Sequence, residues 1–387
     1  MFVRAGDPGF SRRKLLQGGA LLAAAGVAAA CATQARGEQA EPGTVAWRYP
    51  VEGQMLAGLR VVGGVVLVQT LDSLSGLEAS SGKRLWQVPI TIAPSGIDYY
   101  GGLGDGTLYV CGGDPPYSNE RVLGVDIATG QRNWSFEPPE DAVLNGVFGE
   151  RDGAVLLTVL NQTTRRREAM AVDRATNAVR WRAECPGDNT RLHLPAAGPL
   201  VYSAYNNGDN LLALDAATGA TVWSRAGDVD IQHSAVALGP LGGVILGTDF
   251  GHVFGLDPAT GATMWKTRNL GFAIYEIFAV EDAFFACDGS AVHAWRTGME
   301  ATSLWNLAVS DKREALDASF RASAGVLYLL AAGAVRAIDA GTGNLRWIHT
   351  DPGFDNGQNL RFAVGDTHCY VESDSTTTNP AVVALVC

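Results

Sequence analysis

The stretch LDAATGATVW, residues 214–223, places an aspartate, a Thr-Gly pair and a tryptophan between two short apolar runs. The apolar pattern predicts two antiparallel strands around a tight turn. The carboxylate of Asp215 can accept hydrogen bonds from the backbone N–H groups of that turn. Gly219 fits the last position of a three-residue loop, a type I turn closed by a residue with positive φ. Trp223 then lies on the second strand, where we expect its ring to pack between adjacent sheets.

The same phrase recurs along most of the chain. Six copies are found at 78–86, 126–134, 173–181, 215–223, 257–265 and 339–347. A degenerate seventh copy at 295–305 has Trp295 in place of the aspartate. One copy has Asn177 in place of the glycine, and asparagine is the residue that next best tolerates positive φ. This substitution supports the expected turn.

A tryptophan closes every copy, and one more precedes the first copy. The set is Trp47, Trp86, Trp134, Trp181, Trp223, Trp265, Trp305 and Trp347. Successive members are 39 to 48 residues apart, and two further short apolar strands separated by Gly or Asp turns lie between them. Such a repeat with four strands is typical of a β-propeller, in which each repeat forms one blade.

The number of repeats predicts eight blades. Seven complete units end at the tryptophans from Trp86 to Trp347, and the strands after Trp347 lack a closing tryptophan strand. The strand around Trp47 can supply it from the other end of the chain, so that both termini share the last blade and the ring has no open edge. The expected fold is an all-β, eight-bladed β-propeller of four-stranded antiparallel blades over residues 44–387.

The first 31 residues are typical of an export signal rather than of a folded domain. Arg12 and Arg13 resemble the twin-arginine motif, and a short apolar run follows them. This run is below the ~20 residues needed to cross a bilayer. Cys31 follows three alanines, as in a bacterial lipobox, which predicts a lipidated amino terminus; cleavage after Ala32 and simple secretion is the alternative. Residues 32–43 have the composition of a flexible linker.

Charge and cysteine content limit the possible classes of protein. The formal net charge of −11 argues against binding to nucleic acid, which needs clustered Lys and Arg. The cysteines after Cys31 are scattered singly: Cys111, Cys185, Cys287, Cys369 and Cys387. Most are expected to be small buried residues. Cys369 and Cys387 can lie near each other at the carboxyl end, although spacing alone establishes no disulfide.

The pattern A-x-D-x-x-T-G-x-x-x-W, carried by the copies above, resembles the pyrroloquinoline-quinone-like (PQQ-like) propeller repeat. The resemblance covers residues 44–387 and is specific for the fold. That family includes quinoprotein dehydrogenases and many non-enzymatic relatives, among them an exported lipoprotein branch whose propeller is a docking surface. The alcohol dehydrogenases carry two adjacent cysteines beside the cofactor and are considerably longer. This chain has neither feature, so the resemblance implies the non-enzymatic branch without a bound quinone.

In a propeller the innermost strands and the loops leading into them line a central funnel, where binding residues are expected. Polar and aromatic residues gather in these segments: Arg60, Tyr100, Asn145, His193, His233, Glu276, Arg321 and Arg361. They predict a ligand-binding ring or, more simply, an ordinary hydrogen-bonded and water-filled wall. Glu276 is the best candidate for a base or metal ligand, and His193 or His233 for its titrating partner. No spacing among them forms a triad or a metal cluster.

Together these features predict an exported propeller, lipid-anchored at the extracytoplasmic face of the cell membrane or freely secreted. We expect a monomeric scaffold without catalysis that binds an envelope or extracellular protein or polymer and contacts the membrane only through its anchor. Neither nucleic acid, a cofactor nor a metal is expected. Two alternatives remain: an oxidoreductase that uses pyrroloquinoline quinone with calcium, or another metal, in the funnel, and a solute-binding sensor module.

Overall fold

Antiparallel strands make up nearly all of the secondary structure, as the all-β prediction requires. The computed structural model describes residues 40–51, 56–92, 101–113, 121–185, 191–194, 198–204, 210–226, 237–238, 245–249, 252–269, 276–280, 283–287, 291–296, 302–308, 319–331, 333–354, 360–375 and 378–387. The predicted export signal and most of the predicted linker lie outside the described residues. The chain divides into two units, Met1–Gln39 and Ala40–Cys387, and all the strands belong to the second.

In the described part of the chain, six sheets have four strands each. The first comprises β2 (Gly58–Val62), β3 (Val65–Gln69), β4 (Ser73–Glu78) and β5 (Arg84–Pro89). The next comprises β15 (Arg191–His193), β16 (Leu200–Ala204), β17 (Asn210–Asp215) and β18 (Thr221–Ala226). It is followed by β19 (Ala237–Leu238), β20 (Ile245–Asp249), β21 (His252–Leu256) and β22 (Thr263–Lys266).

The remaining four-stranded sheets lie in the carboxyl-terminal third. One comprises β23 (Glu276–Val280), β24 (Ala283–Cys287), β25 (Ala291–Arg296) and β26 (Thr302–Ala308). Another comprises β27 (Ser319–Ser323), β28 (Val326–Ala331), β29 (Ala334–Asp339) and β30 (Leu345–Thr350), followed by the 3-10 turn η2 (Pro352–Phe354). The last combines β31 (Phe362–Val364), β32 (His368–Ser375), β33 (Thr378–Val386) and the amino-terminal strand β1 (Val45–Pro50).

A nine-stranded sheet holds two repeat units together, which differs from the predicted four-stranded blades. Its strands are β6 (Thr91–Ile92), β7 (Gly102–Leu103), β8 (Thr107–Gly113), β9 (Arg121–Asp126), β10 (Arg132–Phe136), β11 (Ala142–Arg151), β12 (Ala154–Asn161), β13 (Arg167–Asp173) and β14 (Val179–Cys185). The two units join where Leu103 of β7 pairs in parallel with Gly149 of β11. A Cβ atom at Gly102 would lie 2.0 Å from the backbone nitrogen of Gly149. Two glycines therefore allow a backbone approach that merges neighbouring units.

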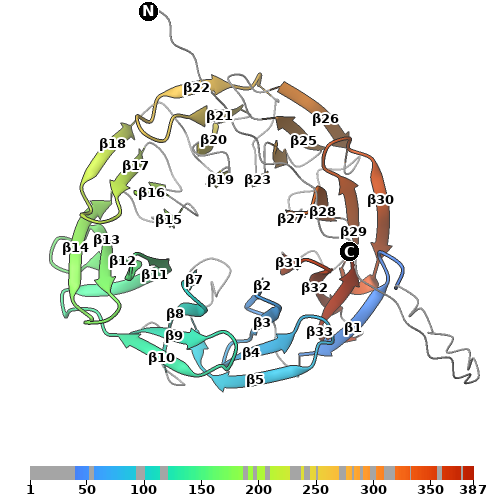
Figure 1. Ribbon diagram of the computed structural model, residues 1–387, viewed down its shortest axis with the longest axis horizontal. Helices are drawn as coiled ribbons and strands as arrows, with labels where there is room; N and C mark the ends of the chain where they lie inside the picture. The colour runs from blue at the N-terminus through green and yellow to red at the C-terminus, as the bar shows by residue number, and fades with distance from the viewer. Residues whose placement is uncertain are drawn as a thin grey trace, which may run out of the picture. The chain divides into compact units, whose positions relative to one another are not determined.

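Within Ala40–Cys387 the sheets follow one another around a common centre (Figure 1). The first strands of the units, such as β2, β15, β23, β27 and β31, lie nearest that centre, and the tryptophan strands lie at the periphery. First strands of successive units contact one another, as β23 does with β27, β27 with β31, and β31 with β2. The centre is therefore lined by the strands that the sequence places first in each repeat.

The sheet that contains both ends of the unit pairs β1 with β33 in antiparallel register. Trp47 lies opposite Ala384, and Tyr49 lies opposite Val382. This is the pairing that the isolated Trp47 strand predicts.

One small residue opposite each tryptophan explains how the outer strand fits its sheet. The pairs are Trp47 with Ala384, Trp86 with Gly76, Trp134 with Gly124, Trp181 with Ala171, Trp223 with Ala213, Trp265 with Gly255, Trp305 with Ala294 and Trp347 with Ala337. The register shifts beside each of these pairs, as at a β-bulge. At Gly76 a Cβ atom would lie 2.3 Å from the indole of Trp86. At this position the ring of Trp86 occupies the space that a side chain would need.

The turn of the repeat is one residue longer than predicted. The N–H of Gly219 donates to the carbonyl of Asp215, and the N–H of Asp215 donates to the carbonyl of Ala220, which leaves four residues in the loop. The Asp215 carboxylate accepts hydrogen bonds from the N–H groups of Ala217 and Thr218, at 3.1 and 2.9 Å, and from the Thr218 hydroxyl, at 2.8 Å. A helix-like turn of this kind needs one more residue than a type I turn. The predicted positive φ is confirmed at Gly219 (+71°) and at Asn177 (+59°).

Each tryptophan also connects its unit to the next one. In six units its Nε1 donates to the carbonyl that follows the acidic residue of the next turn: Trp47 to Ala79, Trp86 to Ile127, Trp134 to Arg174, Trp181 to Ala216, Trp223 to Pro258 and Trp305 to Ala340. The ring covers the turn glycine of the next unit, so that a Cβ atom at Gly219 would lie 2.6 Å from Trp181. The predicted packing of tryptophans between adjacent sheets is therefore confirmed.

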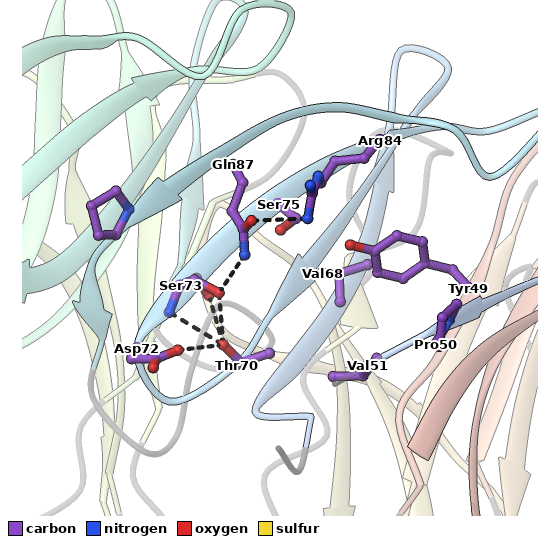
Figure 2. A pocket seen from close by; sticks show the side chains of 11 residues that line it. Tyr49, Pro50, Val51, Val68, Thr70, Asp72, Ser73, Ser75, Arg84 and Gln87 are labelled. Carbon is purple, nitrogen blue, oxygen red and sulfur yellow. Dashed lines mark hydrogen bonds between the residues drawn. The ribbon is translucent and has the colours of Figure 1, made fainter. Parts of the chain in front are cut away.

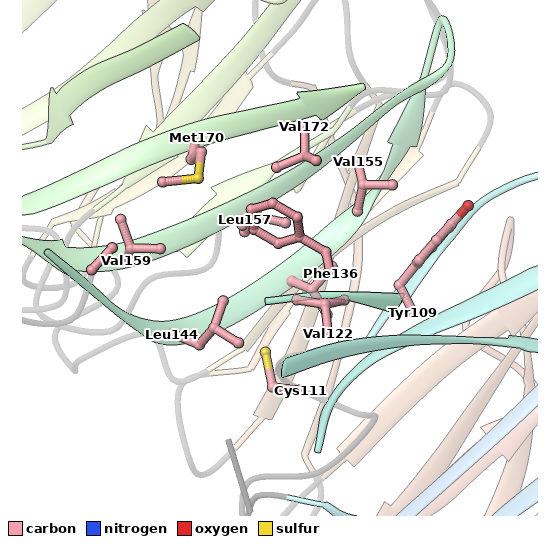
Figure 3. Packing of buried hydrophobic residues seen from close by; sticks show 12 residues of the cluster. Tyr109, Cys111, Val122, Phe136, Leu144, Val155, Leu157, Val159, Met170 and Val172 are labelled. Carbon is pink, nitrogen blue, oxygen red and sulfur yellow. The ribbon is translucent and has the colours of Figure 1, made fainter. Parts of the chain in front are cut away.

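Hydrophobic clusters fill the spaces between neighbouring sheets or units. Figure 3 shows one of them, in which Tyr109 and Val122 of one unit face Val155, Leu157 and other residues of the next. A second cluster lies between the sheet of β1 and β33, which contributes Trp47 and Val382, and the sheet of β2 to β5, which contributes Val66 and Leu77. The core is thus a series of inter-unit layers.

Candidate functional site

The six funnel candidates that the structure describes lie on or beside the first strands of their units. Arg60 is on β2, Asn145 on β11, His193 on β15, Glu276 on β23 and Arg321 on β27. For His193 and Glu276 the structure places only the strand. Arg361 immediately precedes β31, while Tyr100 and His233 lie outside the described residues.

Three of the described candidates take part in structural hydrogen bonds. Arg60 donates from Nη1 to the carbonyl of Gly101 in the next unit, at 2.9 Å. Asn145 donates to the Thr158 hydroxyl on the neighbouring strand, at 3.4 Å. The N–H of Arg361 donates to the buried carboxylate of Glu372, at 3.0 Å. These contacts support the interpretation of the inner strands as a hydrogen-bonded wall.

No group of three or more His, Cys, Asp or Glu side chains comes together as a metal site within the described residues. The described funnel candidates come from separate units, and the hydrogen bonds of Arg60, Asn145 and Arg361 given above reach neighbouring strands or units. The ligand ring, the base and the metal ligand envisaged for the funnel remain predictions.

A polar cavity of about 730 Å³ opens between β1 and the sheet of β2 to β5 (Figure 2). We call it the seam pocket; its lining residues are Tyr49, Pro50, Val51, Val68, Thr70, Asp72, Ser73, Ser75, Arg84, Gln87 and Pro89. Its volume lies within the ~300–1,000 Å³ of small-ligand sites. The funnel candidates do not belong to it.

The sheet register brings the pocket residues together. Val68 of β3, Ser75 of β4 and Gln87 of β5 are cross-strand neighbours and therefore share one face of the sheet. Tyr49 and Pro50 approach from β1, which lies at the edge of the other sheet. Because β1 pairs with β33, it lies beside the sheet of β2 to β5, and the pocket is lined by residues from both sheets.

A hydrogen-bond network orders one side of the seam pocket (Figure 2). The hydroxyl oxygens of Thr70 and Ser73 are 2.8 Å apart, and Thr70 donates to the Asp72 carboxylate at 3.1 Å. Gln87 donates to the Ser73 hydroxyl at 3.3 Å and accepts from Nη1 of Arg84 at 3.0 Å. These side chains therefore present an ordered row of donors and acceptors.

Two pocket hydroxyls remain outside this network. Ser75 is only 4% exposed, and its hydroxyl makes no hydrogen bond to any residue that the structure describes. The hydroxyl of half-buried Tyr49 likewise has no partner among the described side chains. Neither oxygen is among the fully buried polar atoms without a partner, so both reach the solvent of the pocket and are available to an added molecule.

None of the residues that line this pocket is among the site residues predicted from the sequence. Thr70, Ser73 and Ser75 are ordinary turn and strand residues, and the funnel was expected to hold the site. The available signal was Tyr49-Pro50, at the end of the strand that carries Trp47. Only the pairing of β1 in space brings Tyr49 to the first sheet.

The predicted proximity of Cys369 and Cys387 is confirmed. Cys369 lies opposite Leu385 on β33, and the N–H of Cys387 donates to the carbonyl of Thr367 at 2.9 Å. A hydrogen bond from the Cys369 thiol lowers the pKa of Cys387, and Tyr328 adds a second one. The same contact, together with burial, raises the pKa of Cys369. Both cysteines are reduced, and Cys387 is the more exposed of the two.

The repeat geometry agrees with comparisons to known families. The PQQ_2 family model, described as "Outer membrane protein assembly factor BamB", matches residues 10–110, 118–271 and 249–376. The chain belongs to this PQQ-like β-propeller family.

Two curated relatives match parts of this propeller chain. The serine/threonine-protein kinase AfsK of Streptomyces griseus is 30% identical over 191 residues, 46% of this chain. The outer membrane protein assembly factor BamB of Nitrosomonas eutropha is 30% identical over 95 residues, 24% of this chain. Each match spans 22% of the relative's own length.

Solved structures support the fold. BamB from Moraxella catarrhalis superposes with a TM-score of 0.59 and 16% identity, over 88% of this chain and 99% of that one. The computationally designed protein Ika8 gives a TM-score of 0.61 and 14% identity, over 88% and 100%. At these identities the likeness shows the fold alone. Among the described residues, no helix is both long and apolar enough to span a membrane.

Proposed function

We propose that this protein is an exported, lipid-anchored propeller that binds an envelope protein and catalyses no reaction. The observation that carries the proposal is the match of a BamB-type family model to most of the chain. The described inner strands agree with it, because their polar side chains form structural hydrogen bonds. In-cell crosslinking of the full chain tests the proposal, and recovery of the same envelope protein in repeated experiments is the expected result. The absence of any crosslinked envelope protein in repeated experiments would contradict the proposal.

The scaffold we propose has eight blades and is closed by β1. Trp47 supports the closure, because its Nε1 donates to the carbonyl of Ala79 at 3.1 Å and its ring covers Gly82. Trp181 makes the equivalent contacts with Ala216 and Gly219. Replacing Trp47 with alanine should therefore lower the urea midpoint about as much as replacing Trp181 does. A negligible effect of Trp47→Ala would contradict closure.

Export and anchoring rest on Arg12, Arg13 and Cys31, which lie outside the described residues. With two lysines replacing the twin arginines, the chain should remain in the cytoplasm. With Cys31→Ser, it should be exported but released from the membrane fraction. Fractionation and immunoblotting measure both outcomes, and continued membrane attachment of Cys31→Ser would show that another element holds the chain. We expect the anchored chain to act as a monomer.

The proposed absence of catalysis is tested with the cofactor of the enzymatic branch. Pyrroloquinoline quinone and Ca²⁺ added to the full chain should produce no absorbance shift and no dye reduction with alcohols or sugars. Reduction that disappears in Glu276→Ala would replace the scaffold proposal with an oxidoreductase that uses the funnel.

A further inference from the structure

The seam pocket is a polar site that the scaffold role does not use. It contains four hydroxyl groups, from Tyr49, Thr70, Ser73 and Ser75, besides the amide of Gln87. Its charged side chains are one carboxylate, Asp72, and one guanidinium, Arg84. The pocket therefore carries no net charge and suits a neutral ligand rather than an anion or a cation.

The two unpartnered oxygens specify the ligand further. A hydroxyl both donates and accepts a hydrogen bond. The hydroxyls of Ser75 and Tyr49 are therefore best matched by ligand groups that can also act as donor and as acceptor. A ligand that carries several hydroxyls meets this requirement at each position. The Thr70–Ser73 row beside them offers further acceptors and donors at fixed positions.

The apolar surfaces of the pocket agree with a sugar ring. Val51 and Val68 are buried, and the ring of Tyr49 provides a flat wall beside them (Figure 2). The carbon-bound hydrogens of one face of a sugar can pack on such a wall while its hydroxyl groups point to the polar row. Small-molecule sites commonly combine apolar walls with a few polar groups in this way.

An extended peptide is a poorer fit. The pocket is bordered by β1 and β5, which lie at the edges of their sheets and could bind a peptide by strand addition. Pro50 of β1 and Pro89 of β5 lie in the lining, and proline has no backbone N–H to donate to an added strand.

We propose that the seam pocket binds a neutral saccharide unit, contacted by the Ser75 and Tyr49 hydroxyls and packed on the Tyr49 ring. This site is independent of the protein partner proposed above. It gives the propeller a second ligand class of the kind that a glycan polymer presents.

Titration calorimetry of the full chain with maltotriose, cellotriose and chitotriose tests the proposal, with the tripeptide Gly-Ser-Gly as a comparison. We expect at least one trisaccharide to bind saturably and Ser75→Ala to weaken its binding about fivefold, as for the loss of one hydrogen bond. Tyr49→Ala should abolish binding. Ser135→Ala, on the exposed face of β10, is the matched control and should leave the affinity unchanged.

The Ser75 hydroxyl makes no hydrogen bond to any residue that the structure describes, so Ser75→Ala should keep the thermal midpoint of the protein. A loss of saccharide binding by this variant would therefore not result from unfolding. No saturable binding of any trisaccharide, an affinity unchanged by both pocket variants, or saturable binding of the peptide instead would overturn the proposal. Crosslinking of Ser75→Ala to the envelope partner should be unaffected, which separates failure of this site from failure of the scaffold role.

Discussion

Alanine at Gly219 is the sharpest test of how the repeat units hold together. Gly219 has a φ of +71°, and a Cβ atom there would lie 2.6 Å from Cε3 of Trp181 in the preceding unit. The substitution therefore imposes two separate penalties, one on the turn itself and one on the contact between units. We expect Gly219→Ala to fold with a clearly lowered free energy of unfolding.

The magnitude follows from these two terms. A left-handed conformation costs a residue with a Cβ about 1–2 kcal/mol. Carbon atoms in ordinary contact are about 3.5–4.0 Å apart, so the new methyl overlaps the ring by about 1 Å, and overpacking of this kind costs about 1–3 kcal/mol. Moving the indole away also strains its 3.0 Å hydrogen bond to the carbonyl of Ala216. The expected loss is about 2–5 kcal/mol.

The assay is equilibrium urea unfolding followed by tryptophan fluorescence. Gly106→Ala is the matched control, because Gly106 also has positive φ (+63°) but no atom lies within 4 Å of its would-be Cβ. It should lose only the conformational term, about 1–2 kcal/mol. If Gly219→Ala were no more destabilised than Gly106→Ala, the packing of Trp181 on the next turn would not stabilise the fold as argued.

Three further predictions concern single contacts. Trp223→Phe should lower the free energy of unfolding by about 1 kcal/mol more than Trp265→Phe does. The Nε1 of Trp223 donates to a carbonyl at 2.7 Å, whereas the buried Nε1 of Trp265 has no acceptor among the described residues. Equal urea midpoints of the two variants would refute this prediction. Iodoacetamide should alkylate Cys387 before the buried thiols of Cys111, Cys185 and Cys369, with a half-maximal rate below pH 9, since the pKa of Cys387 is lowered from the ordinary 9.0. Peptide mass spectrometry identifies the labelled site, and earlier labelling of one of these three buried thiols would contradict the prediction. Two hydrogen bonds from Arg180 hold the pKa of Asp173 at about 2 against an ordinary 3.8, so the carboxylate stabilises the fold above pH 3.8 and this contribution disappears as the pH falls toward 2. Thermal midpoints should therefore depend less on pH in Asp173→Asn over this interval, and an unchanged slope would show that the pair does not contribute.

The regular part of the fold could be predicted because each repeat position has a local cause. Tryptophan, aspartate and glycine each meet a requirement of their own turn or strand, and Asn177 meets the positive-φ requirement in the copy without glycine. The turn length was wrong by one residue, because the carboxylate of Asp215 caps a helix-like turn rather than a type I turn. Local patterns predict which residues face each other more reliably than they predict loop conformation.

The merged sheet and the seam pocket could not be predicted, because both depend on approaches between distant segments. The merger needs Gly102 and Gly149 to meet backbone to backbone, and neither glycine belongs to the repeated phrase. The pocket needs Tyr49 to approach Ser75, and neither residue has a periodic signature. The funnel candidates Arg60 and Asn145 were placed on the correct strands, yet the contacts described for them are structural.

The degenerate copy shows which positions of the repeat are interchangeable. Trp295 takes the place of the capping aspartate, and the ring of Phe284 stacks between Trp265 and Trp295, with centroid distances of 5.2 and 5.0 Å and interplanar angles of 16° and 14°. Stacked aromatic area thus replaces both the polar cap and the inter-unit hydrogen bond at this junction. The small residue opposite the closing tryptophan is nevertheless kept, as Ala294 opposite Trp305. The sheet can therefore exchange its polar cap for ring stacking, whereas the residue opposite the closing tryptophan is Gly or Ala in every one of the eight pairs.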